Sequence, residues 1–386
     1  MPRHLKIVII FGGIYSIAMQ MAILLVPLYA LQLGLPPLSL AFIVSVPAVL
    51  QIAIRAIGGA INNYLGENRI LKISFLAISL AGMLFIFSDT VASIYLAQFV
   101  LSVSRGLFWS TAQTYLSRQP EAEGRLSRIF GYFEVTTAIG GIAGLLIGGY
   151  FSQWFGLSWA FSLLVMVGLI SFLMCRFLPE SPRNRTKRIS PSGFRNFGAV
   201  VRHRPLYLAG LCAFTAALPL SLAGSFYPVH FKELGMEDGM IGAIVSMMAL
   251  GSITAGLFVA RVLDRVRVLF PYVVSLMLIG FTLITIQFLS SPLALGLLIV
   301  ITGLGSGTSS ILYQSLTAKF STSENRGPAM AFTTNFWSLS HLIIPVLFGA
   351  LTEKISLPAS FVVAGVGIII IGSTALLGRR WFRADL

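Results

Sequence analysis

The chain has 386 residues, of which 56% are hydrophobic and 10% are charged, with a formal net charge of +14 and a mean hydropathy of +0.88. A soluble domain carries about 25% charged residues, so the composition excludes an ordinary soluble protein. Cys175 and Cys212 are the two cysteines, which excludes a disulfide framework or a cysteine-based metal set.

Apolar stretches of roughly 20 residues, long enough to cross a bilayer, recur along the whole sequence. Backbone groups inside hydrocarbon must be hydrogen-bonded within the segment, so we predict an all-α polytopic membrane protein with twelve transmembrane helices. The first apolar run is too long for a signal peptide and is counted as a helix. The spans are predicted at 7–33, 38–61, 70–88, 91–117, 126–152, 157–177, 205–231, 238–262, 268–288, 292–318, 327–350 and 357–378.

A basic segment, residues 179–204, separates a six-helix domain of residues 1–178 from one of residues 205–386. With the N-terminus in the cytoplasm, 23 of the 27 Lys and Arg fall in cytoplasmic segments, and the outer loops hold Lys232 and Lys354. The positive-inside rule then predicts cytoplasmic termini and a multi-pass protein of the plasma membrane, the inner membrane in a bacterium. Topology and lipid attraction account for the positive charge, so we expect no nucleic-acid partner.

The two halves repeat each other at an offset of 201 residues. QTYLSRQPEAEGR begins at Gln113, and QSLTAKFSTSENR begins at Gln314; both end in Glu-x-Arg. The same offset relates Gly106 to Gly307 and Gly148 to Gly349. Repeated halves of six helices are typical of secondary transporters, in which the substrate site lies at the repeat interface near the membrane midplane.

With this repeat, the chain resembles the major facilitator superfamily over nearly all of its length. The family's motif after helix 2 has the form Gly-x-Leu-Ala-Asp-Arg-x-Gly-Arg, and the matching stretch here is GAINNYLGENR. Asn63 replaces the motif's aspartate and Glu67 replaces an arginine. The resemblance implies a cytoplasmic gate, or alternatively charges that only set topology, at Gly59, Asn63, Gly66 and Arg69 and, in the second half, Arg261, Asp264 and Arg265.

Helix 5 contains GYFEVTTAIGGIAGLLIGG, which is similar to the family's antiporter motif, with Leu145 in place of its proline. Small residues four apart let two helices approach closely, so we expect either a sliding seam of an exporter or plain helix packing. The glycines of this antiporter-like motif are Gly131, Gly140, Gly144, Gly148 and Gly149.

Arg105 lies near the centre of an apolar span, and Glu134 is the carboxylate well inside the next one. Counted from Arg118 and Arg125, their depths differ by about 6 Å at 1.5 Å per residue, so the two side chains are predicted to meet. Three interpretations stay open: a structural salt bridge, a proton-coupling pair, or an Arg105 that binds an anionic group of the substrate. His341 is a further proton-coupling candidate.

Polar and aromatic residues in the middle of spans favour a bundle interior or a wet cavity over lipid. Each of them is either a substrate contact or an interhelical hydrogen bond. The cavity candidates are Tyr15, Gln20, Arg105, Trp109, Gln113, Tyr313, Gln314, Asn335 and Trp337.

The sequence holds no P-loop, HExxH motif or Cys/His metal set, which argues against an enzyme and leaves an ion gradient as the energy source, with no cofactor or metal. We expect proton-coupled export, by antiport, of a small organic drug or metabolite by a monomer that needs only this substrate and the lipid bilayer. A symporter or facilitator for an organic anion held by Arg105 is the alternative. A non-transporting membrane sensor or an intramembrane enzyme is the alternative from another class.

Overall fold

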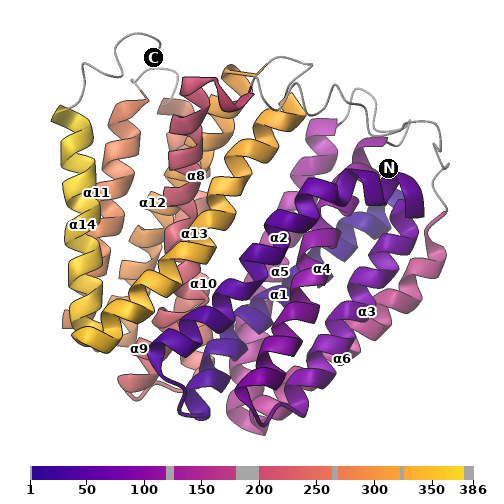
Figure 1. The fold of residues 1–386 in the computed structure, drawn as a ribbon, viewed down its shortest axis with the longest axis horizontal. Helices are drawn as coiled ribbons and strands as arrows, with labels where there is room; N and C mark the ends of the chain where they lie inside the picture. Colours follow the sequence, from indigo (N-terminus) through magenta and orange to yellow (C-terminus); the bar gives the residue numbers. More distant parts are fainter. Residues whose placement is uncertain (1, 119–125, 180–199, 263–267, 322–325, 378–386) are drawn as a thin grey trace. The chain divides into compact units, whose positions relative to one another are not determined.

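A computed structural model describes residues 2–118, 126–179, 200–262, 268–321 and 326–377, and its secondary structure there is helical (Figure 1). Twelve helical segments in this part of the chain are long and apolar enough to cross a membrane. The prediction of a twelve-helix membrane protein is therefore confirmed, and the predicted spans overlap the observed ones throughout.

Six spans make up the first half of the sequence. They are α1 (Arg3–Gln32), α2 (Pro37–Leu65), α3 (Glu67–Ile86), α4 (Val91–Arg118), α5 (Leu126–Phe155) and α6 (Leu157–Met174), the last continued by the short 3-10 helix η2 (Cys175–Phe177). In this half α1 packs along α5, while α3 packs against α4 and α6.

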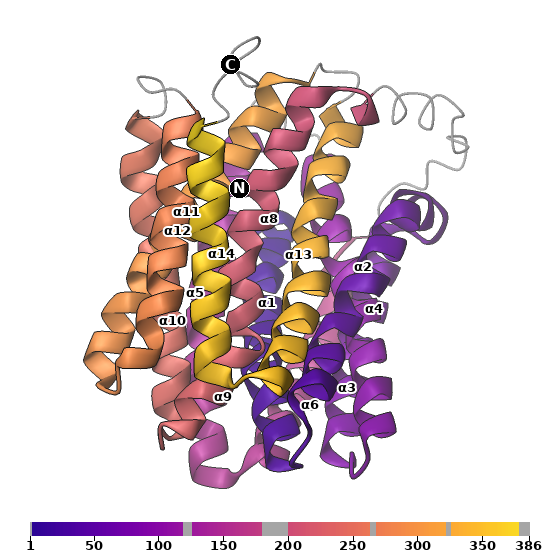
Figure 2. The ribbon, with the colours of Figure 1, turned by 60° about the vertical axis from the view of Figure 1, so that its left-hand side comes forward.

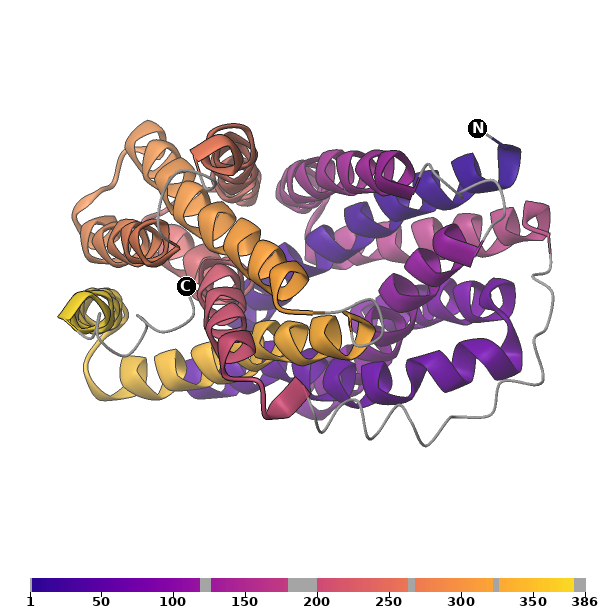
Figure 3. The same cartoon turned by 90° about the horizontal axis from the view of Figure 1, so that it is seen from above.

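The second half is built from α8 (Arg204–Ala223), α9 (Phe226–Glu233), α10 (Asp238–Val262), α11 (Leu269–Thr285), η3 (Ile286–Phe288), α12 (Pro292–Lys319), α13 (Arg326–Lys354) and α14 (Leu357–Leu377). Here α8 packs along α13, and α11 packs against α12 and α14. Figures 2 and 3 show α14, in yellow, beside α11. These pairs repeat the pairs of the first half.

The internal repeat extends to individual turns. Helices α1, α2 and α4 begin at residues 3, 37 and 91, and α8, α10 and α12 begin 201 residues later, at 204, 238 and 292. Gly34 and Gly235, also 201 apart, follow the first and seventh spans with φ of 66° and 80°. Only glycine adopts this conformation readily, so the same reversal of chain direction is built twice.

Contacts divide the chain into two compact units. The first unit holds Met1–Leu33, Ile43–Ile189 and Glu237–Ala243, and the second holds Gly34–Phe42, Ser190–Met236 and Ile244–Leu386. Relative to the predicted halves, the start of α2 is grouped with the second unit and the start of α10 with the first. The predicted domain limits at 178 and 205 flank residues 180–199, which lie outside the described residues, and they stay a prediction.

The seventh span is interrupted, whereas the sequence predicts one continuous helix over 205–231. Helix α8 contains Pro219 and ends at Gly224, and Ser225 has φ −144° and ψ −82° before α9 begins. The hydroxyl of Ser221 donates to the carbonyl of Ala217, and that of Ser225 donates to the carbonyl of Ser221. These bonds engage carbonyl groups next to the break, as a bilayer requires.

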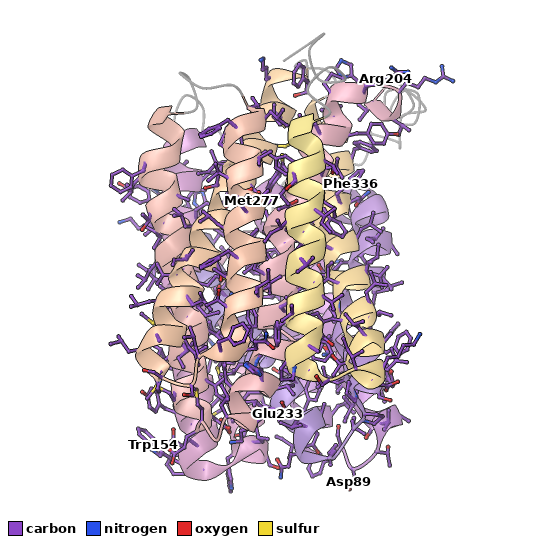
Figure 4. The ribbon with its side chains drawn as sticks, turned by 90° about the vertical axis from the view of Figure 1, so that its left-hand side faces the viewer. Asp89, Trp154, Arg204, Glu233, Met277 and Phe336 are labelled. Atoms are coloured by element: carbon purple, nitrogen blue, oxygen red, sulfur yellow. The ribbon has the colours of Figure 1, made fainter. Side chains whose placement is uncertain are left out.

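The ends of the spans carry the charged and aromatic residues that favour a membrane interface. In the second unit, Arg204 and Glu233 lie at opposite ends of the α8–α9 span (Figure 4). In the first unit, Asp89 and Trp154 lie at the same end (Figure 4), and Trp154 is 69% exposed. Exposed indoles of this kind are enriched at the membrane–water boundary.

The charge bias predicts that the 179–204 linker faces the cytoplasm and that Asp89 faces outward. The variants Ser192→Cys and Asp89→Cys, each made in a chain with Cys175 and Cys212 replaced, should differ in reactivity. A membrane-impermeant maleimide added to intact cells should label position 89 and spare position 192 until the cells are opened. Labelling of position 192 in intact cells would contradict the predicted orientation.

Candidate functional site

Arg105 lies at the middle of α4, 14 residues after Val91 and 13 before Arg118. Its side chain is half-buried, and its Nε donates to the sulfur of Met19 on α1 at 3.3 Å. A thioether is a weak acceptor and carries no charge. The guanidinium is therefore held in place without being neutralised by this contact.

An aromatic cluster in the first unit includes Tyr15, the side chain that interacts electrostatically with Arg105. Tyr15 stacks on Phe108 with 3.7 Å between ring centroids, and its hydroxyl lies 3.2 Å from the hydroxyl of Ser104. Trp109 meets the rings of Tyr15 and Phe133 nearly at right angles, at 5.6 and 5.9 Å. Tyr15, Phe108 and Phe133 are fully buried and form an aromatic wall, whereas Trp109 is half-buried.

The open side of this cluster is a stripe along α4. Arg105, Trp109 and Gln113 follow one another at intervals of four residues and therefore share a face. Arg105 and Trp109 are half-buried and Gln113 is exposed. Gln20, on α1, is half-buried and lies beside Gly141 of α5. The first-half candidates therefore differ in access: Tyr15 is enclosed, whereas the other four reach the surface of this unit.

Arg105 and Glu134 do not pair, which corrects the predicted contact. No ion pair joins them, although both side chains belong to the described part of the chain. Glu134 is exposed and lies on the face of α5 that also carries Leu145, eleven residues or about three turns later. Equal depth along two helices does not fix the direction in which each side chain points, and α5 has α1 rather than α4 as its main neighbour.

A second polar group lies on α12 and α13 in the second unit. Tyr313 and Trp337 have ring centroids 6.2 Å apart, and the indole stacks on His341 at 6.0 Å. Nδ1 of His341 lies 3.3 Å from the carbonyl oxygen of Trp337. Tyr313, Trp337 and His341 are half-buried, so the structure brings these three candidates together.

The two remaining second-half candidates differ in their surroundings. Gln314 is exposed, and its amide donates to the hydroxyl of Ser310 on the preceding turn at 3.4 Å. Asn335 is half-buried on α13.

His230 is a buried histidine that belongs to no motif and is absent from the predicted candidates. It lies in α9 with 3% of its surface exposed, 5.3 Å from the ring of Phe361. The backbone of Ile286 faces the imidazole, but within the described residues neither ring nitrogen meets hydrogen-bond geometry. The helix break before α9 places this residue, and no local pattern in the sequence predicts that break.

The glycines of helix 5 face two different neighbours within the first unit. A methyl group on Gly140 or Gly144 would clash with the carbonyl oxygens of Gly13 and Ile17 on α1, and one on Gly148 would lie 3.2 Å from Met21. Gly149 instead approaches the carbonyl of Asp238 at the start of α10. Gly131 is exposed, with nothing within 4 Å of the position of a Cβ atom.

The contact between α5 and the start of α10 is also polar. The hydroxyl of Ser152 donates to a carboxylate oxygen of Asp238 at 3.0 Å, and the backbone N–H of Gly239 donates to the side-chain oxygen of Gln153 at 3.1 Å. The amide of Gln153 also donates to Glu237. A hydrogen-bonded cluster therefore follows the antiporter-like motif directly.

Most of the predicted gate residues lie outside the described side chains. Gly59, Asn63 and Arg261 fall in helices whose side chains are not described there, and Asp264 and Arg265 lie outside the described residues. Gly66 separates α2 from α3 with φ 83°, and Arg69 is exposed on α3. Within the described residues no group of three or more His, Cys, Asp or Glu is placed to hold a metal ion.

Substituting leucine for Gly144 should force α1 and α5 apart, because backbone atoms of Ile17 occupy the space. We expect a destabilisation of about 1–3 kcal/mol, typical of overpacking, and a loss of transport, measured by thermal unfolding and by vesicle uptake. Gly131→Leu is the matched control in the same helix and should change neither. Equal effects of the two substitutions would contradict the assignment of Gly144 to the face of α5 that packs closely against α1.

The absence of an ion pair predicts the outcome of a double-mutant cycle with Arg105→Gln and Glu134→Gln. Their effects on the free energy of unfolding should add to within about 0.5 kcal/mol, as for independent sites. Thermal unfolding of the two single variants and the double variant measures this. A coupling energy well above 1 kcal/mol between the two substitutions would show that Arg105 and Glu134 interact after all.

Comparison with known proteins identifies one family and several similar proteins. The family model for the Major Facilitator Superfamily matches residues 8–236 and 209–385. The quinolone resistance protein NorA of Staphylococcus aureus is 23% identical over 398 aligned residues, covering 99% of this chain and 97% of that protein. A multi-drug resistance efflux pump PmrA homolog of Lactococcus lactis is 23% identical over 62% of each chain. The solved nucleoside transporter NupG superposes with a TM-score of 0.81 at 11% identity, covering 97% of this chain and 99% of that one.

Proposed function

The chain belongs to the major facilitator superfamily, whose members are transporters rather than enzymes, and we propose that it exports small organic molecules, drugs or metabolites, in exchange for protons. The observation that carries this proposal is the similarity to a quinolone resistance protein over 99% of the chain and to a multi-drug resistance efflux pump over 62% of it. Twelve candidate spans in the described residues and the repeated six-helix halves agree with a secondary transporter that alternates access by moving one half against the other.

A proton gradient is the proposed energy source, because the sequence holds no nucleotide-binding loop. Among the described spans, the carboxylate that lies more than a few residues from a span end is that of Glu134. Ionisable groups at such depth are costly and mark proton or substrate pathways. Glu134 is exposed, so we assign it the role of taking up and releasing the coupling proton.

The remaining polar residues have supporting roles in this proposal. His341, on α13, is a second proton-binding candidate, and its Nδ1 already contacts a backbone carbonyl. Trp109, Gln113, Tyr313 and Gln314 are substrate contacts, since each keeps part of its surface accessible in its own half. The plasma membrane is the proposed location.

A transport assay with the purified protein in sealed proteoliposomes tests the proposal. Ethidium and rhodamine 6G, which carry no carboxylate, should move against their gradients when a pH difference is imposed and should stop when the difference is collapsed. Glu134→Gln should lose accumulation driven by the pH gradient while still exchanging substrate, because an amide neither takes up nor releases a proton.

Asp89→Asn is the matched control, because it removes an exposed carboxylate from the same half at a span end. It should transport like the unaltered protein. Uphill transport by Glu134→Gln would reject the role of this residue. A pH gradient without effect on either probe would reject proton-coupled drug efflux.

A further inference from the structure

We propose that the first unit binds an aromatic carboxylate, with the carboxylate on Arg105 and the ring on Trp109. This ligand assignment rests on the proposed function, which supplies a transporter of small organic molecules, and names the class of molecule that one of its sites recognises.

The first argument is the uncompensated charge of Arg105. Arginine stays protonated in proteins, and an arginine in a span requires a counter-charge, polar partners or water. Its one hydrogen bond within the described part of the chain goes to the thioether of Met19. The polar side chain that interacts with it electrostatically is that of Tyr15, a phenol already in contact with Ser104. A bound anion would supply the missing charge.

The second argument comes from the internal repeat. Arg105 plus 201 is Ser306, and Tyr15 plus 201 is Ala216. In the second unit Ser306 is 3% exposed and donates a hydrogen bond to the carbonyl of Ala216 at 2.7 Å. The helix pair α8 and α12, which corresponds to α1 and α4, therefore packs with a small residue whose hydroxyl is hydrogen-bonded. The architecture does not need a cation here, so packing alone does not explain Arg105.

The third argument is the direction of the side chain. Leu96 and Phe99 are 52% and 51% exposed on α4, as expected of a surface in contact with lipid. Arg105 follows Leu96 by nine residues, which at 100° per residue places it on the opposite side of the helix. Arg105 and Trp109 therefore lie on the side of α4 away from Leu96, whereas Gln113, fourteen residues after Phe99, comes round to within about 40° of that apolar side chain.

The fourth argument is the match between the stripe and the ligand. The guanidinium presents two parallel N–H groups that fit a carboxylate, and the indole of Trp109 offers a partly exposed aromatic surface. Residues four apart on a helix have Cβ atoms about 5–6 Å apart. A ring attached directly to a carboxylate can therefore reach the indole while the carboxylate binds the guanidinium.

The neighbouring residues favour a monoanion over a dianion such as a phosphate monoester. Met19, Tyr15, Ser104, Trp109 and Gln113 are uncharged, so a second negative charge would have no cation among them. One arginine neutralises one carboxylate.

Binding to the purified full-length protein tests the proposal, measured by calorimetry and by thermal stabilisation. The probes are benzoate, indole-3-carboxylate and 2-naphthoate, each paired with its neutral amide. We expect at least one carboxylate to bind roughly 10- to 100-fold more tightly than its amide, the range for hydrogen bonds to a charged group. Arg105→Gln should abolish this preference, and Trp109→Leu should weaken carboxylate and amide together.

Arg69→Gln is the matched control, because it removes an exposed arginine from the end of a span in the same unit. It should keep the preference for carboxylates. Arg105→Lys keeps the charge without the paired N–H groups, so it should bind carboxylates with intermediate affinity. This variant also serves if Arg105→Gln does not fold.

The proposal is overturned if no carboxylate is preferred over its amide, or if the preference survives in Arg105→Gln and Arg105→Lys alike. Ethidium export separates this failure from failure of the proposed function, because ethidium has no carboxylate. An unaltered protein that exports ethidium but shows no preference among the six probes would keep the transport proposal and reject the ligand class.

Discussion

The close approach of α1 and α5 is the contact on which the first unit depends. Gly140 and Gly144 leave no room for a side chain against the backbone of Gly13 and Ile17, so the two helices touch through main-chain atoms. In a bilayer apolar side chains gain little by leaving lipid, and such close packing becomes a main source of helix association. The contact fixes α1, and α1 in turn presents Tyr15 and Met19 to α4, where they meet Ser104 and Arg105.

The two units solve the same packing problem with different chemistry. Their helices start at matching positions, and α8 packs along α13 as α1 packs along α5. Yet the first unit places a guanidinium beside an aromatic wall, whereas the second places Ser306 against a backbone carbonyl. The second unit differs again at Gly224, where the helix of the seventh span is interrupted. His230 lies buried in α9, the short helix that follows this interruption. Shared architecture with unshared polar groups is the arrangement expected where function is added to a repeated scaffold.

Much of the fold follows from the sequence because bilayer thickness and backbone hydrogen bonding leave few choices. Span positions, the repeat and the glycine face of helix 5 are all patterns along one chain, and each can be seen in the sequence. The pairing of Arg105 with Glu134 failed because it needed the azimuth of two side chains, which depth does not supply. The break before α9 was missed because proline and glycine, the residue types at 219 and 224, also occur inside continuous helices of this chain. Tertiary packing decides whether a helix continues through such residues or breaks there.

The surroundings of Arg105 also set how tightly the proposed site can bind an anion. A permanent carboxylate partner such as Glu134 would satisfy Arg105 and leave no affinity for an arriving anion, whereas an arginine with no contact would be free to take several rotamers. The bond from Nε to Met19 restricts the side chain without neutralising it. This preorganisation lowers the entropic cost of binding, while one ion pair and one aromatic contact are few enough to be released again, as any transport cycle requires.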